Sequence, residues 1–90
     1  MADTAQQTVA ATITVTYFAA LVDRTGCRRE DLPVATATVG GLRAAVAARH
    51  GESVGELAVL SSVLDGDDML RDPDAPIGRV VDLLPPFAGG

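Results

Sequence analysis

Apolar and polar residues alternate over residues 13–18, the first patterned stretch of the chain. Successive side chains of a strand point to opposite faces, so the alternation divides this stretch into two sets. Ile13, Val15 and Tyr17 form the set expected to face the core, and Thr14, Thr16 and Phe18 form the outward set. Residues 1–11 show no such period and are rich in Thr, Gln and Ala, which predicts a flexible N-terminal extension ahead of the strand.

A helical period appears over residues 39–50, where apolar positions recur after three and four residues. The apolar stripe consists of Val39, Leu42 and Val46. Thr38 is suited to the N-cap because its hydroxyl can accept a hydrogen bond from a free N–H of the first turn. Gly51 is suited to end the helix. Gly40 and Gly41 each cost roughly 1 kcal/mol relative to Ala in a helix interior, so burial of the stripe must hold this helix.

The remaining patterned segments are short. Before the main helix, we expect a helical turn at residues 19–25 ended by Gly26 and a weak strand within residues 28–34. After it, we expect a turn and strand within residues 57–64, a hairpin at Asp65 and Gly66, and a short strand at residues 69–70. A loop at residues 72–76 then leads to a nearly all-apolar strand at residues 80–84. The predicted order is β-β-α-β-β, with one main helix that must cover a face of the sheet. We therefore expect one α+β domain over residues 12–84.

The charge composition narrows the class of partner. The net charge of −5 argues against a nucleic-acid surface, whose affinity comes from many Lys and Arg side chains on phosphates. All seven basic residues are Arg, so the chain has no Lys to accept an isopeptide bond from a second copy. We expect no membrane span and no secretory signal, because no run approaches eighteen apolar residues and the start is not basic and then apolar. One Cys rules out an intramolecular disulfide and suits a reducing compartment, so we expect a cytoplasmic protein.

Conventional catalytic or metal-binding sets of side chains are not apparent. His50 is the only His and follows Arg49 at the end of the predicted helix, where a solvent-facing cap role is expected. Cys27 follows a turn glycine without a His nearby in sequence, so we interpret it as a structural thiol. The acids between residues 65 and 74 lack the spacing of a calcium loop, which indicates a solvated loop, with an electrostatic docking surface as the alternative. We expect neither a metal site nor a bound cofactor.

The C-terminal residues 85–90 carry the strongest functional signal. Gly89 and Gly90 have no side chain, so they can enter a channel too narrow for any other residue and bring a terminal carboxylate to a reactive centre. Pro85 and Pro86 fix φ and favour an extended path, which projects the thread from the body. The sequence therefore predicts a flexible tail whose terminus, rather than any side chain, takes part in the chemistry.

Residues 83–90, LLPPFAGG, resemble the end of the small, sulfur-carrying subunit of molybdopterin synthase, in the MoaD/ThiS group of ubiquitin-like proteins. Residues 13–20 are similar to the opening strand and small-residue turn of that family, residues 38–42 to the start of its helix, and residues 72–76 to the loop before its last strand. The resemblance covers about residues 13–90. It implies a ubiquitin-like β-grasp fold, a mixed sheet covered by one main helix, with the first and last strands side by side and parallel.

The resemblance also implies a reaction cycle. An E1-like adenylyltransferase would use ATP to adenylate the Gly90 carboxylate, and a sulfur donor would convert it to a thiocarboxylate. The tail would then deliver the sulfur to a pterin precursor inside the large subunit of molybdopterin synthase. An α-carboxyl group with a pKa of about 3.3–3.7 is ionised at neutral pH and is a poor acyl donor, so ATP has to supply the leaving group. On this reading the chain itself is a non-catalytic, sulfur-donating subunit.

A partner surface follows from the same pattern. If Ile13, Val15 and Tyr17 face the helix, Phe18 faces out, and parallel pairing places Leu83 or Leu84 near it. The resemblance points to Leu84, together with Phe18 and Phe87, as the contact with the large subunit. The alternative is that Phe18 closes the lower rim of the core.

Two other functions stay open at this point. One is a related sulfur carrier for thiamine, cysteine or another sulfur pathway, although the pair Pro85 and Pro86 favours the molybdopterin synthase carrier. The other is a ubiquitin-like modifier or a plain interaction domain.

Overall fold

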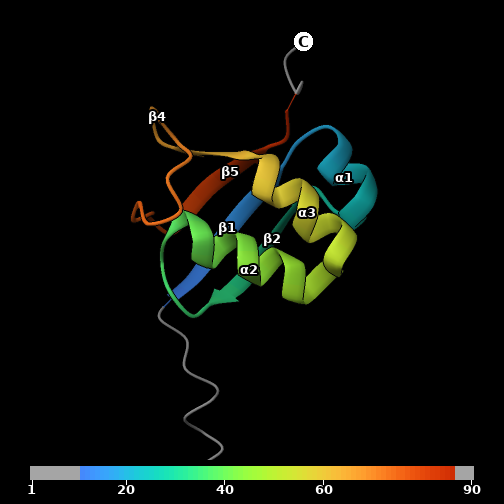
Figure 1. Ribbon diagram of the computed structural model, residues 1–90, viewed down its shortest axis with the longest axis horizontal. Coiled ribbons are helices and arrows are strands. Elements are labelled where there is room, and N and C mark those ends of the chain that lie inside the picture. Colours follow the sequence, from blue (N-terminus) through green and yellow to red (C-terminus); the bar gives the residue numbers. More distant parts are fainter. Residues whose placement is uncertain (1–10, 87–90) are drawn as a thin grey trace, which may run out of the picture.

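The computed structural model describes residues 11–86, which form one five-stranded mixed sheet and three helices (Figure 1). In chain order the elements are β1 (Ala11–Tyr17), α1 (Ala20–Thr25), β2 (Arg29–Val34), α2 (Val39–His50), α3 (Glu52–Leu60), β3 (Ser62–Asp65), β4 (Asp68–Leu70) and β5 (Val80–Leu84). The predicted N-terminal extension, apart from Ala11, and residues 87–90 of the predicted tail lie outside the described residues.

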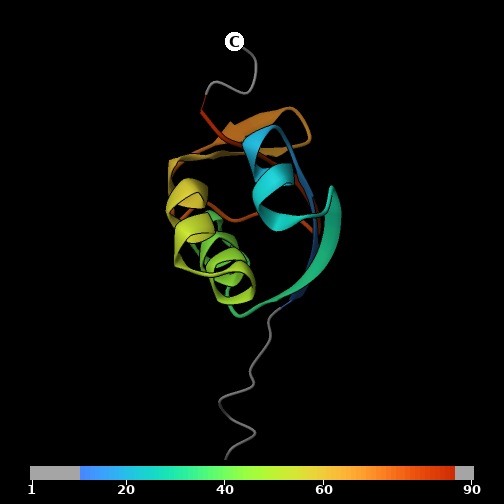
Figure 2. The same ribbon diagram turned by 90° about the vertical axis from the view of Figure 1, so that its right-hand side faces the viewer.

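The order of strands in the sheet is β2-β1-β5-β3-β4. β1 and β5 run parallel, with Tyr17 opposite Leu83, and the other neighbouring strands are antiparallel. Figure 2 shows α2 and α3 side by side over one face of this sheet. This mixed sheet, with the first and last strands paired in parallel under a helix, confirms the predicted ubiquitin-like β-grasp fold.

The core lies between the helices and the sheet. The inward set of β1 is fully buried, as the alternation predicts, and it packs with the apolar stripe of α2 and the inward residues of β5. These residues are Ile13, Val15 and Tyr17 from β1, Val39, Leu42 and Val46 from α2, and Val81 and Leu83 from β5. Burial of this set holds α2 despite its two glycines, since each buried Val or Leu side chain contributes about 1.5–3 kcal/mol.

The helix ends follow their sequence signals. α2 begins and ends at the predicted residues, and the N–H of Gly41 donates to the Thr38 hydroxyl at 3.0 Å. Gly26 ends α1 in the left-handed region, at φ 78°, with its N–H donating to the carbonyl of Val22. Pro33 lies in the edge strand β2, the position in a sheet where the missing N–H of a proline is tolerated.

Two sequence predictions about secondary structure were wrong. Residues 52–60 form the helix α3, whereas the sequence predicted only a possible short turn before a strand. Gly55 allows α3 to approach α2 closely, because a Cβ there would lie 2.6 Å from the Cβ of Ala47. β1 also ends at Tyr17, one residue earlier than predicted, and Ala19 takes a positive φ of 53° as the chain turns into α1.

No helix within residues 11–86 is both long enough and apolar enough to cross a membrane.

Candidate functional site

The chain leaves the sheet from its central strand. At the end of β5, Leu83 is buried in the core and Leu84, on the opposite face, is half-buried. Pro85 is buried as well, and Pro86 is exposed. The described body therefore holds the chain through Pro85, and the predicted thread begins from a rigid anchor. Phe87, Gly89 and Gly90, the other tail residues assigned from the sequence, lie outside the described residues.

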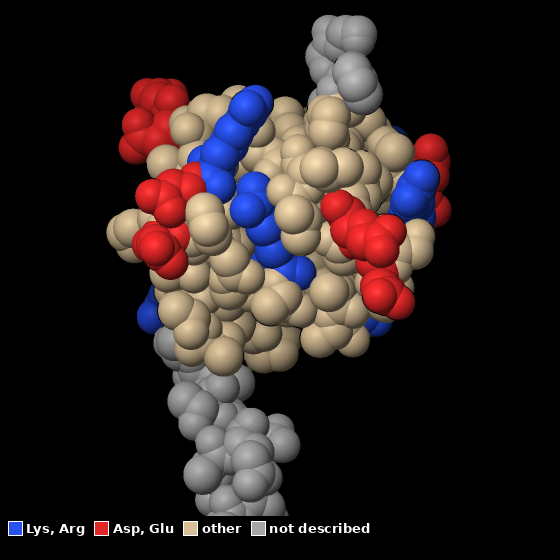
Figure 3. Space-filling model, viewed as in Figure 1, with Lys and Arg blue, Asp and Glu red and all other residues tan. Residues whose placement is uncertain are grey.

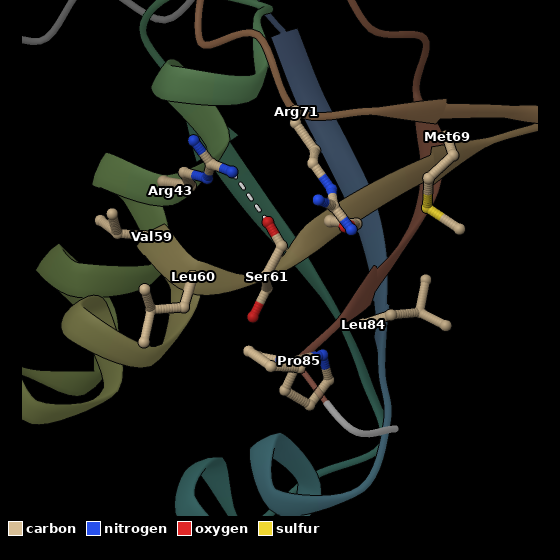
Figure 4. Close-up of a pocket in the computed structure, with 10 residues that line it drawn as sticks. Arg43, Val59, Leu60, Ser61, Met69, Arg71, Leu84 and Pro85 are labelled. Atoms are coloured by element: carbon tan, nitrogen blue, oxygen red, sulfur yellow. Dashed lines mark hydrogen bonds between the residues drawn. The ribbon is translucent and has the colours of Figure 1, made fainter. Parts of the chain in front are cut away.

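An open groove of about 570 Å³ lies beside this exit, between the end of α3 and the strands β3, β4 and β5 (Figure 4). Ten residues line it: Arg43, Val59, Leu60, Ser61, Ser62, Met69, Arg71, Leu84, Pro85 and Pro86. Three apolar members are largely exposed, Leu60 by 67%, Val59 by 59% and Met69 by 54%. Exposed apolar side chains gathered around a groove are typical of an interaction surface.

Two arginines supply the charge of the groove. Arg43 donates from Nε to the carbonyl of Ala58 at 3.1 Å and from Nη2 to the carbonyl of Ser61 at 2.8 Å. The Ala58 carbonyl also accepts from the N–H of Ser61, so Arg43 adds a second hydrogen bond at the end of α3. Burial lowers the pKa of its guanidinium from the ordinary value, and an Arg keeps its charge in proteins all the same. Arg71 donates from Nε to the Ser62 hydroxyl at 2.9 Å.

The surrounding charges are mixed. Figure 3 shows basic side chains at the centre of the visible face, acidic groups on both sides of them, and uncharged surface between them and the end of the described chain. In a protein with a net charge of −5, Arg43 and Arg71 place local positive charge in a groove that is lined by both polar and apolar side chains. The arrangement suits a partner segment that carries apolar side chains and at least one acidic group.

Phe18 lies at the surface, with 38% of its area exposed, and lines a second open hollow of about 470 Å³ with residues of β1 and α1. Phe18 and Leu84 directly follow Tyr17 and Leu83, which are opposite each other on β1 and β5. The structure thus brings both residues to the same end of two neighbouring strands, although they line different hollows.

Sequence reasoning missed the groove residues Val59, Leu60 and Met69. The signal available was a pair of apolar residues at the end of a segment assigned to a turn and strand. Only the helical assignment of residues 52–60 places Val59 and Leu60 on the exposed end of a helix.

A second cluster of polar side chains lies on the core side of the sheet, around Glu30. The Tyr17 hydroxyl donates to Glu30 Oε2 at 2.5 Å, His50 Nε2 lies 2.5 Å from the same oxygen, and Arg49 Nη1 lies 3.6 Å from Oε1. The His50 ring also packs edge-on against Tyr17, with the ring centroids 6.0 Å apart. The predicted solvent-facing role for His50 was therefore wrong, because only 14% of its side chain is exposed and it joins the end of α2 to β2.

The pKa shifts in this cluster follow from its contacts. Burial, with the hydrogen bond to Glu30 and its charge, raises the pKa of Tyr17 far above the usual range, so the phenol stays neutral. Burial acts to raise the pKa of Glu30. The hydrogen bonds from His50 and Tyr17, with the charges of His50 and Arg49, outweigh the effect of burial, so the pKa of Glu30 is lowered overall. Glu30 is thus a carboxylate on β2 that is held by one side chain of β1, Tyr17, and two of α2, Arg49 and His50.

The chain is similar to known proteins both in its sequence family and in its fold. The model of the ThiS family matches residues 15–90. Two crystal structures of small archaeal modifier protein 1 from Haloferax volcanii match with a TM-score of 0.64 each. They are 27% and 28% identical in sequence, and the matches cover 87% and 89% of this chain and 100% of theirs. A search of curated proteins finds no match.

Proposed function

This chain belongs to the ThiS family of ubiquitin-like sulfur carriers, and we propose that it is the sulfur-carrying small subunit of a molybdopterin synthase. A carrier domain of this kind is not itself catalytic, and such carriers work with E1-like activating enzymes and partner subunits. The family match through Gly90 supports the sulfur-carrier part of the proposal. The pair Pro85 and Pro86 ahead of the final Gly-Gly is the observation that favours the molybdopterin synthase carrier.

The proposed cycle uses the terminus of the chain. An E1-like adenylyltransferase joins the Gly90 carboxylate to the AMP part of ATP and releases pyrophosphate. A sulfur donor then displaces AMP and leaves a thiocarboxylate on Gly90. The large synthase subunit accepts the tail and the sulfur passes to a pterin precursor. Water cleaves the bond between the sulfur and the Gly90 carbonyl, which restores the carboxylate. The chain holds no cofactor of its own in this proposal, since ATP belongs to the activating enzyme, and the location that suits it is the reducing cytoplasm.

The body of the domain supports this chemistry by positioning. Pro85 is buried at the end of the central strand β5, so the tail starts from a fixed point. A reactive carbonyl at the end of a thread lands correctly only if the thread has the right length, and a displacement of about an ångström can cost roughly a hundredfold in rate. Gly90 is thus the reacting residue, and Gly89, Pro85 and Pro86 set its reach.

The groove beside the exit is the surface that we assign to partner docking. Leu84 lines it at the end of β5, on the same side as the exposed Met69 and across from the exposed Leu60 (Figure 4). A partner that covers this groove would take the tail in the same approach, because Pro85 and Pro86 line the groove too. Phe18 and Phe87 complete the proposed contact with the large subunit.

Intact-mass measurement after co-expression with a cognate activating enzyme and sulfur donor tests the proposal. The expected product has one oxygen exchanged for sulfur, and the product of a chain without Gly90 does not. The Gly90-deleted chain should melt at the same temperature as the parent. Full sulfur transfer by the Gly90-deleted chain contradicts the proposal. Co-purification of a pterin-binding large subunit supports the molybdopterin pathway, and its absence beside a thiocarboxylate indicates a carrier for thiamine, cysteine or another pathway.

A second function is favoured by one observation, the likeness to a protein called small archaeal modifier protein 1. A modifier would use the same activated Gly90 to form an amide bond with a lysine of another protein. The same mass measurement separates the two functions, because a modifier gives adducts on other proteins instead of a stable thiocarboxylate. The chain has no Lys, so it cannot build chains on itself in this way.

A further inference from the structure

The cluster around Glu30 brings together three side chains that can ligate a metal ion. Cys27 Sγ, a carboxylate oxygen of Glu30 and a ring nitrogen of His50 all lie within 4.8 Å of one another. They come from three places in the fold, the loop before β2, the strand β2 and the last residue of α2. All three are half-buried, so solvent can reach the cluster.

The donor set is informative. One thiolate sulfur, one imidazole nitrogen and one carboxylate oxygen are the three ligand types that Zn²⁺ uses in proteins. Oxygen-preferring ions such as Ca²⁺ and Mg²⁺ do not select a thiolate or an imidazole. We propose that Cys27, Glu30 and His50 form a binding site for Zn²⁺ or a similar transition-metal ion, with water as the fourth ligand. The site is distinct from the groove and does not depend on the proposed function.

Charge and proton balance favour this ion. A Zn²⁺ ion bound by one thiolate, one carboxylate and one neutral imidazole makes a site with no net charge. Binding displaces the thiol proton of Cys27 and the proton through which His50 Nε2 donates to Glu30, and it involves no oxidation or reduction. In the metal-bound state, His50 Nε2 and a Glu30 carboxylate oxygen would each contact the ion instead of each other. The distance between these two atoms must therefore increase from 2.5 Å. Metal bonds of about 2.0–2.3 Å at tetrahedral angles space ligand atoms roughly 3.3–3.7 Å apart.

The surroundings hold the ligands in place. The Tyr17 hydroxyl donates to Glu30 Oε2, which is the kind of outer contact that orients a metal-binding carboxylate. The Cys27 N–H donates to the Thr25 hydroxyl at 3.3 Å, and that hydroxyl also lies 3.7 Å from Sγ. A bound ion would tie the loop before β2 to the end of α2. Because Tyr17 pairs with Leu83, this tie would lie at the end of the sheet from which the tail leaves.

The test uses Co²⁺, whose spectrum reports its ligands. The chain contains one Cys and one His, so a thiolate-to-cobalt charge-transfer band in a tag-free protein can come only from Cys27. The full chain, with its terminus as carboxylate, is stripped with chelator, kept reduced with a phosphine and titrated with Co²⁺. We expect one ion per chain, a charge-transfer band, intense visible bands of a tetrahedral site, and displacement of Co²⁺ by Zn²⁺.

Variants decide which side chains bind. Cys27→Ser should remove the charge-transfer band. Glu30→Gln and His50→Gln should each weaken Co²⁺ binding by at least about 10–100-fold, the loss that follows removal of an outer contact alone. Asp31→Asn is the matched control, because Asp31 is the next residue of β2 and its carboxylate bonds Thr14 on the opposite, outward face of the sheet. This variant should bind Co²⁺ like the parent.

Three results would overturn the proposal: no charge-transfer band in the parent, a band that persists in Cys27→Ser, or unchanged affinity in both Glu30→Gln and His50→Gln. The last of these would mean binding by a lone thiolate. Circular dichroism checks that each variant is folded. If Glu30→Gln does not fold, Cys27→Ser and His50→Gln decide the outcome together: the first tests the thiolate, and unchanged affinity in the second means binding by a lone thiolate.

Discussion

Replacing Gly41 with alanine brings two opposing effects to the first turn of α2. Helix propensity alone predicts that the change stabilises the protein by up to about 1 kcal/mol. The structure predicts the opposite sign, because a Cβ on Gly41 would lie 1.8 Å from the carbonyl oxygen of Thr36 and 2.8 Å from its carbonyl carbon. These are backbone atoms, so no rotation of a side chain can relieve the overlap.

The size of the loss follows from what must move. The Thr36 carbonyl also accepts from the N–H of Thr38 at 2.8 Å, and the Thr38 hydroxyl accepts from the N–H of Gly41. Moving Thr36 therefore disturbs the N-cap. Overpacking costs about 1–3 kcal/mol and a lost cap about 1 kcal/mol, against a propensity gain of about 1 kcal/mol. We expect Gly41→Ala to lower the free energy of unfolding by about 1–3 kcal/mol, which corresponds to a fall in Tm of roughly 10 °C in a domain of this size.

Urea denaturation followed by circular dichroism measures this change. Ala44→Gly is the control, since Ala44 is exposed on the same helix and should lose only about 1 kcal/mol from helix propensity. A Gly41→Ala variant with a midpoint at or above that of the parent would refute the reasoning, because it would mean that the Thr36 carbonyl can retreat at no cost.

Three other predictions concern strain, docking and the tail. Ala19 has a φ of 53°, so Ala19→Gly should relieve backbone strain and raise the free energy of unfolding by about 1 kcal/mol; a lower Tm in thermal melting would contradict this. Phe18→Ala and Phe87→Ala should each weaken binding to the large subunit by about 1–3 kcal/mol in calorimetric titration, with smaller effects on melting. Unchanged affinity with a large drop in Tm would assign Phe18 to the core instead. Gly89→Val should fold normally but be impaired in adenylation or sulfur transfer, because a β-branched side chain widens the thread and restricts its backbone; a parallel loss of Tm and activity would mean that the tail is structural.

Local signals were sufficient for much of the fold. The bounds of α2 follow from Thr38, Gly51 and the apolar stripe between them, and all of these act within one helix. The inward and outward sets of β1 follow from strict alternation. The nearly all-apolar β5 left Leu83 and Leu84 open, and the family resemblance pointed to Leu84, which the structure places on the face opposite the buried Leu83.

Tertiary contacts decided the elements that the sequence missed. The apolar run of residues 57–64 fits a strand or a helix, and Gly55 counts against a helix by propensity. The helix forms because Gly55 lets it pack closely against Ala47 of α2. The polar cluster was missed for a related reason. His50 and Glu30 are twenty positions apart in the chain, and only the packing of α2 on β2 brings them into contact.

The place of β5 in the sheet affects when this domain can fold. A ribosome makes β1 early and β5 late, yet β5 lies between β1 and β3, so the sheet stays divided until residues 80–84 have left the exit tunnel. The groove lacks Leu84 and Pro85 until the same moment. A partner that docks in this groove would therefore bind only molecules whose synthesis and folding are finished, and it would not bind nascent or truncated chains.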